Sequence, residues 1–273
     1  MPGEPDPRYI IARRTLLDVL EAFEVQRRAL IVVGAQAIYL HTGEADVGLA
    51  PYTTDGDLVL DVDALIDEPT LSEIMERAGF RRGQQPGCWI SGDGIVIDLH
   101  VPASLGGTGR RGARLGPHGN VAARKARGLE AAIVDRAPQT IRAFDADDRR
   151  VLTVDVAGPA ALLVSKMQKI AERERQLERS DDKDAHDVYR LLRGIDAQVL
   201  ASGVKVLLAH QLSARVTAEA LEYLDRLFGR PRGVGCQMVV RAAGGGGNLL
   251  VDAETVAASC AVLATDLLAS TRS

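Results

Sequence analysis

The stretch Thr54-Asp55-Gly56-Asp57-Leu58-Val59-Leu60 decides how the first half of this chain is interpreted. Its apolar end predicts an extended strand, and alternate side chains of a strand point to the same face. Asp55 and Asp57 would therefore share one face and could bind one divalent cation between them. A solvated strand edge is the alternative, because Asp61 and Asp63 continue the same alternation. Carboxylates beside buried apolar residues need a metal or a partner, so the pattern favours a metal site.

Two neighbouring segments could complete this site. Residues 30–33 are apolar and predict a short buried strand that ends at Gly34, followed by a helix from Ala35. Such a turn presents backbone N–H groups to a phosphate, although close packing is the commoner reason for a glycine there. Asp98 ends a second apolar strand, which begins at Ile95, and could supply a third carboxylate. Metal-assisted phosphoryl transfer uses this combination of groups.

A basic stripe is predicted in the second half of the chain. Lys166, Lys169 and Arg173 are spaced i, i+3 and i+7, which places them on one face of a helix. Such a stripe could neutralise a triphosphate, or it could be a solvated surface. Asp184 and Asp187 follow, one helical turn apart, and acidic residues there are often partners of the helix dipole.

A second basic region lies in residues 105–128, which are rich in glycine and arginine and predict a loop with a short helix. It either attracts phosphate groups of a nucleic acid or is a solvated loop. Its basic groups are Arg110, Arg111, Arg114, His118, Arg124, Lys125 and Arg127.

Composition excludes several other classes of protein. The net charge of −4 gives no general attraction to nucleic acid, and 4% aromatic residues leave few stacking platforms for single strands. Cys88, Cys236 and Cys260 are far apart and show neither zinc-site nor disulfide spacing. The chain shows no signal-peptide pattern and no run of 18 apolar residues. We therefore expect a soluble, cytoplasmic protein with no membrane partner.

The order of elements predicts an α+β fold in two domains. Residues 1–157 would hold a small mixed sheet with flanking helices, and residues 158–273 would be helical. The expected helices of the first domain are 15–29, 35–41 and 68–78, and its strands are 30–33, 54–60, 88–90, 95–101, 140–144 and 151–156. The expected helices of the second domain are 159–178, 182–193, 196–209, 214–228 and 252–269, with residues 233–247 as a break.

Four motifs, taken in order, resemble the nucleotidyltransferases of the DNA polymerase β-like superfamily. The similarity is greatest to the AbiEii-type group, which includes bacterial toxins such as the MenT proteins. The motifs read Gly34-Ala35, Thr53-x-Asp55-x-Asp57, Lys166 to Arg173, and Lys183-Asp184-x2-Asp187. Together they extend over about residues 30–193.

The resemblance implies a two-lobed enzyme that binds an NTP with Mg²⁺ and transfers a nucleotide to an acceptor. It implies metal binding by Asp55, Asp57 and Asp98, with Asp98 also activating or orienting the acceptor hydroxyl. Nucleotide contacts would come from Gly34, Ala35, Thr53, Lys166, Lys169 and Arg173, with Asp187, or else Asp184, positioning Lys166. In the toxins the acceptor can be a tRNA 3′ end, and an antitoxin can silence the enzyme. Here RNA would bind through Arg110, Arg111, Arg114, Arg124 and Lys125.

Three residues depart from the family pattern. Ala35 stands where many relatives have glycine or serine, Pro51 where several have arginine, and Gly56 where an apolar residue is usual. These departures motivate an alternative, a relative that binds nucleotide but transfers nothing. A second alternative is a small-molecule transferase such as an aminoglycoside adenylyltransferase, against which the basic loop argues because cationic antibiotics prefer acidic clefts.

Overall fold

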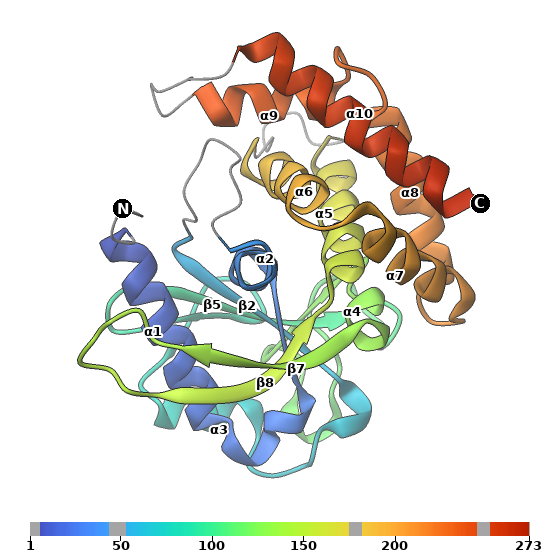
Figure 1. Ribbon diagram of the computed structural model, residues 1–273. Helices are drawn as coiled ribbons and strands as arrows, with labels where there is room; N and C mark the ends of the chain where they lie inside the picture. The colour runs from blue at the N-terminus through green and yellow to red at the C-terminus, as the bar shows by residue number, and fades with distance from the viewer. Residues whose placement is uncertain (1–5, 44–52, 175–181, 245–251, 273) are drawn as a thin grey trace. The chain divides into compact units, whose positions relative to one another are not determined.

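The computed structural model describes residues 6–43, 53–174, 182–244 and 252–272 (Figure 1). The chain divides into two compact units, one of Met1–Ala37 and Tyr52–Ala157, the other of Ile38–Pro51 and Gly158–Ser273. The sequence did not predict that the second part of the helix expected at 35–41, from Ile38 on, groups with the helical half. Pro51 lies outside the described residues, as does the end of the helix expected at 159–178.

The first unit is built on one mixed sheet. Its strands follow the order β3-β4-β5-β2-β1-β8-β7, and β6 also pairs with β5. The strands are β1 Leu30–Val33, β2 Asp55–Leu60, β3 Arg81–Arg82, β4 Cys88–Ile90, β5 Val96–Pro102, β6 Arg124–Ala126, β7 Arg136–Arg142 and β8 Val151–Ala157. The α+β class is confirmed, and the sheet is larger than predicted because β3, β6 and the start of β7 were not expected from the sequence.

The centre of the sheet carries the acidic strand. β2 lies between β1, to which it is antiparallel, and β5, to which it is parallel. All four residues of β1 are buried, as expected for a continuous apolar strand covered on both faces. The position of β2 between two paired neighbours leaves its backbone little freedom, so its side chains are held in fixed positions.

The predicted hairpin between β4 and β5 is present, and these strands pair antiparallel. The region 105–128 differs from the expected loop with a short helix. It contains a 3₁₀ helix, Gly116–His118, and then β6, which pairs with the last residues of β5. β4 and β6 therefore pair with different ends of the same strand.

Besides the 3₁₀ helix Gly116–His118, the structure describes six helical elements in this half of the chain. They are α1 Pro7–Ala22, 3₁₀ helices Glu24–Ala29 and Val62–Ala64, α2 Gly34–Thr42, α3 Leu71–Arg77 and α4 Glu130–Val134. α1 begins earlier than predicted because Asp6 accepts a hydrogen bond from the N–H of Arg8, and Pro7 occupies the first helical position. α3 begins later than predicted because Thr70 and Glu73 form a capping box. α1 packs against β2 and β8 (Figure 1).

The second unit is helical, as predicted. Its helices are α5 Pro159–Glu174, α6 Asp182–Gly194, α7 Ala197–Ala209, α8 Ala214–Phe228, α9 Val234–Gly244 and α10 Ala253–Arg272. α5 packs against α6, α7 and α8, and α10 packs against α6 to α9.

α9 corrects the prediction of a break at 233–247. Cys236, Met238 and Val239 are buried and form an apolar face that packs against α6 and α10. A Cβ added to Gly235 would lie 2.5 Å from a ring carbon of Phe228. This glycine therefore permits close packing of a helix rather than ending one.

α10 is long and apolar enough to cross a membrane by length and composition alone. Its inward face includes the buried residues Val256, Cys260 and Leu267, which pack within the helical unit. A core helix of a soluble protein passes the same test, so α10 is weak evidence for a membrane span.

Candidate active site

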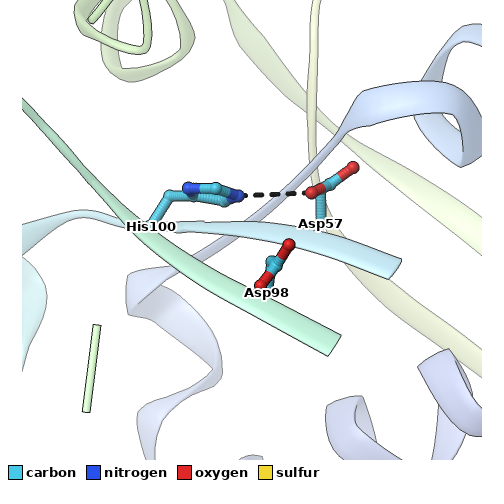
Figure 2. A group of neighbouring side chains, drawn as sticks. All are labelled: Asp57, Asp98 and His100. Carbon is cyan, nitrogen blue, oxygen red and sulfur yellow. Dashed lines mark hydrogen bonds and ion pairs between the residues drawn. The ribbon is translucent and has the colours of Figure 1, made fainter. Parts of the chain in front are cut away.

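Strand register brings two acids together at the centre of the sheet. β2 and β5 are parallel, and Asp57 lies directly opposite Asp98. His100 follows Asp98 by two residues on β5 and therefore shares its face. Ligand atoms of Asp57, Asp98 and His100 all lie within 4.8 Å of one another. Figure 2 shows the two carboxylates directed to the same side of the sheet, with the imidazole beside them.

Asp55 begins β2 and lies outside this cluster. Its Oδ1 accepts a short hydrogen bond from the hydroxyl of Thr53, which is buried. Thr53, a predicted nucleotide contact, thus orients the first carboxylate of its own motif. Whether Asp55 joins Asp57 as a metal ligand stays a prediction.

The Gly34 turn is required by the position of Asp57. Gly34 has φ +69°, and a Cβ added there would lie 2.2 Å from Oδ2 of Asp57. Both the left-handed backbone and the close carboxylate favour glycine. Close packing therefore accounts for this residue, and phosphate binding by the N–H groups that follow it stays a prediction. Ala35, the next residue, is buried.

Gln36 joins the turn to the acidic strand, a role that the sequence did not reveal. Its Nε2 donates to the carbonyl oxygen of Asp55 at 3.0 Å, and its Oε1 accepts from Nε of Arg13 at 2.9 Å. Gln36 and Arg13 are both buried. The start of β2 is therefore held by side chains as well as by strand pairing.

Arg124, which the sequence grouped with the loop arginines, lies in the acidic cluster instead. Its NH2 donates to Oδ2 of Asp98 at 2.7 Å, and its Nε donates to Nδ1 of His100 at 3.4 Å. Nε2 of His100 lies 3.2 Å from Oδ1 of Asp57. The guanidinium of Arg124 therefore contacts the carboxylate of Asp98 directly. It is linked to the carboxylate of Asp57 through the imidazole of His100.

The cluster fits a divalent cation. Burial, followed by the neighbouring charge of Asp57, raises the pKa of Asp98 above its ordinary value, and Arg124 opposes that rise. Oδ1 of Asp98 is buried and has no hydrogen-bond partner among the described residues. A buried carboxylate oxygen without a partner is costly, and a cation shared with Asp57 would satisfy it. Carboxylate oxygens are the ligands that Mg²⁺ prefers.

The predicted lysine and aspartate motifs meet in the second unit. Nζ of Lys166 donates to Asp184 at 2.7 Å and to Asp187 at 2.6 Å. Asp184 also forms ion pairs with Lys169 at 3.1 Å and Arg173 at 2.7 Å. Lys166 is buried, whereas Lys169 and Arg173 are more exposed. The positive charges of the stripe therefore offset the negative charges of the acids of α6, and Lys166 is the cation that contacts both Asp184 and Asp187.

Charge balance in this network shifts two pKa values in opposite directions. Burial alone would raise the pKa of Asp184, but the cations, Lys166 first among them, outweigh it and lower the pKa to about 2. Burial alone would lower the pKa of Lys166, but Asp184 and Asp187 raise it well above its ordinary value. Lys166 and Asp184 are therefore both charged at neutral pH.

The remaining basic groups of residues 105–128 lie in three different environments. Arg110, Arg111, Arg114 and Arg127 are exposed. Nζ of Lys125 donates to the carbonyl oxygens of Gly107 and Gly109 and so ties the loop together. His118 is buried and accepts the N–H of Leu71, at the first residue of α3, which removes it from the predicted basic surface.

A family model described as nucleotidyltransferase matches residues 13–205. The chain belongs to this nucleotidyltransferase family. The match begins in α1, ends in α7 and includes both clusters described above. Membership makes the chain an enzyme that transfers phosphorus-containing groups. The chain matches no curated protein and no solved structure significantly.

The packing of Gly34 predicts that Gly34→Ala lowers metal affinity as well as stability. Left-handed backbone at an alanine costs about 1–2 kcal/mol, and the new methyl group would displace the carboxylate of Asp57. The measurements are chemical unfolding and Mn²⁺ titration by water-proton relaxation. Gly94→Ala is the control, because Gly94 has φ +79° but nothing within 4 Å of its Cβ position. Equal Mn²⁺ affinity in the two variants would contradict the account.

The Asp184 network predicts a loss of stability in acid. The folded pKa is about 2 and the ordinary value is 3.8, so the stabilisation is complete above about pH 4 and disappears as the pH falls toward 2. The linked free energy is about 2 kcal/mol. Chemical unfolding followed by circular dichroism across this pH range should show a shallower pH dependence for Asp184→Asn than for the wild type.

Asp182→Asn is the control for that experiment. Asp182 is also in the first turn of α6, but its ion pair with Arg241 is largely exposed and contributes little. The control should keep the wild-type pH dependence. A shallower dependence in Asp182→Asn, with none in Asp184→Asn, would contradict the assignment.

Proposed function

We propose that this nucleotidyltransferase requires Mg²⁺ and binds it through Asp57 and Asp98, with Asp55 as the remaining ligand. The observation that carries the proposal is the register of β2 and β5, which sets Asp57 against Asp98 and leaves Oδ1 of Asp98 buried without a partner. A bound cation would stabilise these two adjacent, partly buried carboxylates, which repel each other when both are ionised.

In this proposal the cation, when bound, neutralises phosphate charge and orients the NTP for displacement at its α-phosphorus. Neighbouring residues of the chain hold the proposed metal ligands in place. Asp57 is set by His100 and by the Gly34 turn, and Asp55 is set by Thr53. Asp98 holds the cation and orients the acceptor hydroxyl, as the resemblance implies. The N–H groups at the start of α2, which follow Gly34, are our proposed phosphate contact, because the N-terminus of a helix suits an anion.

The cations of the second unit have a different part in the proposal. Because Lys166 is enclosed by Asp184 and Asp187, we assign it to holding α5 and α6 together. Lys169 and Arg173 are more exposed and remain the better candidates for nucleotide contacts, as the AbiEii-type resemblance implies.

We further propose an RNA acceptor, a tRNA 3′ end in particular, as in the AbiEii-type and MenT toxins. The support is the resemblance together with three exposed arginines, Arg110, Arg111 and Arg114. An antitoxin partner and a cytoplasmic location belong to the same proposal.

The structure bears on the alternative of an inactive relative. Gly56, which motivated it, lies in regular register opposite Ile97, and Cδ1 of Ile97 occupies space 2.7 Å from where a Cβ would be. Ile97 therefore takes up part of the volume that an apolar side chain fills in relatives. β2 pairs regularly through this glycine, with Asp55 opposite Val96 and Asp57 opposite Asp98.

The test is incubation of the purified protein with each α-labelled NTP, Mg²⁺ and total tRNA. The wild type should label RNA, and Asp57→Asn and Asp98→Asn should each lose more than about 100-fold, because loss of a mere supporting partner already costs about 10–100-fold. Asp63→Asn, an exposed acid just after β2, is the control and should keep activity.

Three outcomes would contradict the proposal in different ways. Equal labelling by the wild type and both variants would remove the catalytic role of the acids. Labelling of an aminoglycoside but no RNA would favour the small-molecule transferase. Thermal stabilisation by NTP and Mg²⁺ without any transfer would favour the nucleotide-binding relative.

A further inference from the structure

We propose that His100 is a positioning residue for Asp57 and not a metal ligand, and that Arg124 fixes it in this role. The inference rests on the metal site of the proposed function. Position alone would allow either role, because Nε2 of His100 belongs to the same 4.8 Å cluster as the two carboxylates (Figure 2).

Arg124 decides which nitrogen of His100 carries the proton. A guanidinium has only donors and stays protonated, so its Nε–H can contact Nδ1 of His100 only if Nδ1 is an acceptor. The ring proton of the neutral imidazole is then on Nε2. The opposite tautomer would set two N–H donors against each other across 3.4 Å.

The proton on Nε2 gives that atom a donor role. It donates to Oδ1 of Asp57 at 3.2 Å. A protonated ring nitrogen has no lone pair for a cation, so His100 supports a ligand without being one. Histidine ring orientation is commonly set through its second nitrogen in this way.

The same arginine organises the other carboxylate. NH2 of Arg124 holds Oδ2 of Asp98 at 2.7 Å, while Oδ1 of Asp98 is left buried and unpartnered among the described residues. Arg124 lies directly opposite His100 in the β5–β6 register, so strand pairing fixes both contacts. Its charge also reduces the repulsion between Asp57 and Asp98. Arg124 is thus a positioning residue for both acids.

The first test measures the tautomer directly and needs no enzymatic activity. Long-range ¹H–¹⁵N spectra of the wild type, recorded above the usual titration range of histidine, should show an unprotonated Nδ1 and a protonated Nε2 for His100. Addition of Mg²⁺ should leave Nε2 protonated. Arg124→Gln should release this preference, and Arg111→Gln, which changes an exposed arginine, should not.

A proton on Nδ1, alone or together with Nε2, would overturn the proposal. Loss of the Nε2 proton when Mg²⁺ is added would also overturn it, because His100 would then be a ligand. Since this experiment uses the wild type, it remains decisive if a variant fails to fold.

The second test separates a donor from a ligand by substitution. His100→Gln places an amide N–H at about the distance of Nε2, whereas the side chain of His100→Asn is too short to reach Asp57. We expect His100→Gln to keep Mn²⁺ affinity within about threefold, and His100→Asn and Arg124→Gln to lose about 10–100-fold. Equal losses in His100→Gln and His100→Asn would overturn the positioning role.

Kinetics distinguish this inference from the function on which it rests. With saturating NTP, His100→Asn should raise the Mg²⁺ concentration needed for half-maximal rate while leaving the KM for NTP within about threefold. Absence of transfer by the wild type would refute the proposed function, while the tautomer and the Mn²⁺ affinities would still test the role of His100.

Discussion

The register between β2 and β5 is the constraint on which the site depends. Backbone pairing of two parallel strands sets Asp57 opposite Asp98, so the backbones of these two residues stay side by side while the strands at the centre of the sheet remain paired. Like charges so close repel, so the fold must compensate. Arg124 does so from β6, by an ion pair with Asp98 and through the imidazole that faces Asp57. A cation would complete the compensation, because the arginine leaves one buried oxygen of Asp98 unsatisfied.

The two charged clusters of the chain use opposite charge balances. In the first unit, Arg124 forms an ion pair with Asp98, yet burial and the neighbouring charge of Asp57 still raise the pKa of Asp98. In the second unit, Asp184 contacts three cations and its pKa falls to about 2. Among the described ion pairs, the first cluster therefore holds more acidic than basic groups, whereas in the second Lys166, Lys169 and Arg173 offset the charges of Asp184 and Asp187. This difference is why we place the metal in the first cluster and assign Lys166 a holding role.

Local sequence patterns predicted the helices and strands whose formation depends on residues close together in the chain. The apolar run of β1, the strand from Asp55 and the glycine at 34 could each be identified from neighbouring residues, and most helices of the second unit followed from their periodicity. Contacts set by strand pairing could not be predicted in this way. The sequence did not single out His100, and it grouped Arg124 with the loop arginines, because nothing local indicates that β6 pairs with β5. Gly235 likewise suggested a break, since only the ring of Phe228 explains it.

The most direct test of the account is anomalous diffraction from crystals of the wild type soaked in Mn²⁺, an ion that binds the oxygen ligands preferred by Mg²⁺. The account predicts an anomalous peak between the carboxylates of Asp57 and Asp98, in contact with Oδ1 of Asp98, with His100 beside Asp57 and outside the coordination sphere. No peak at these carboxylates, or a peak ligated by Nε2 of His100 with Arg124 turned away, would contradict it.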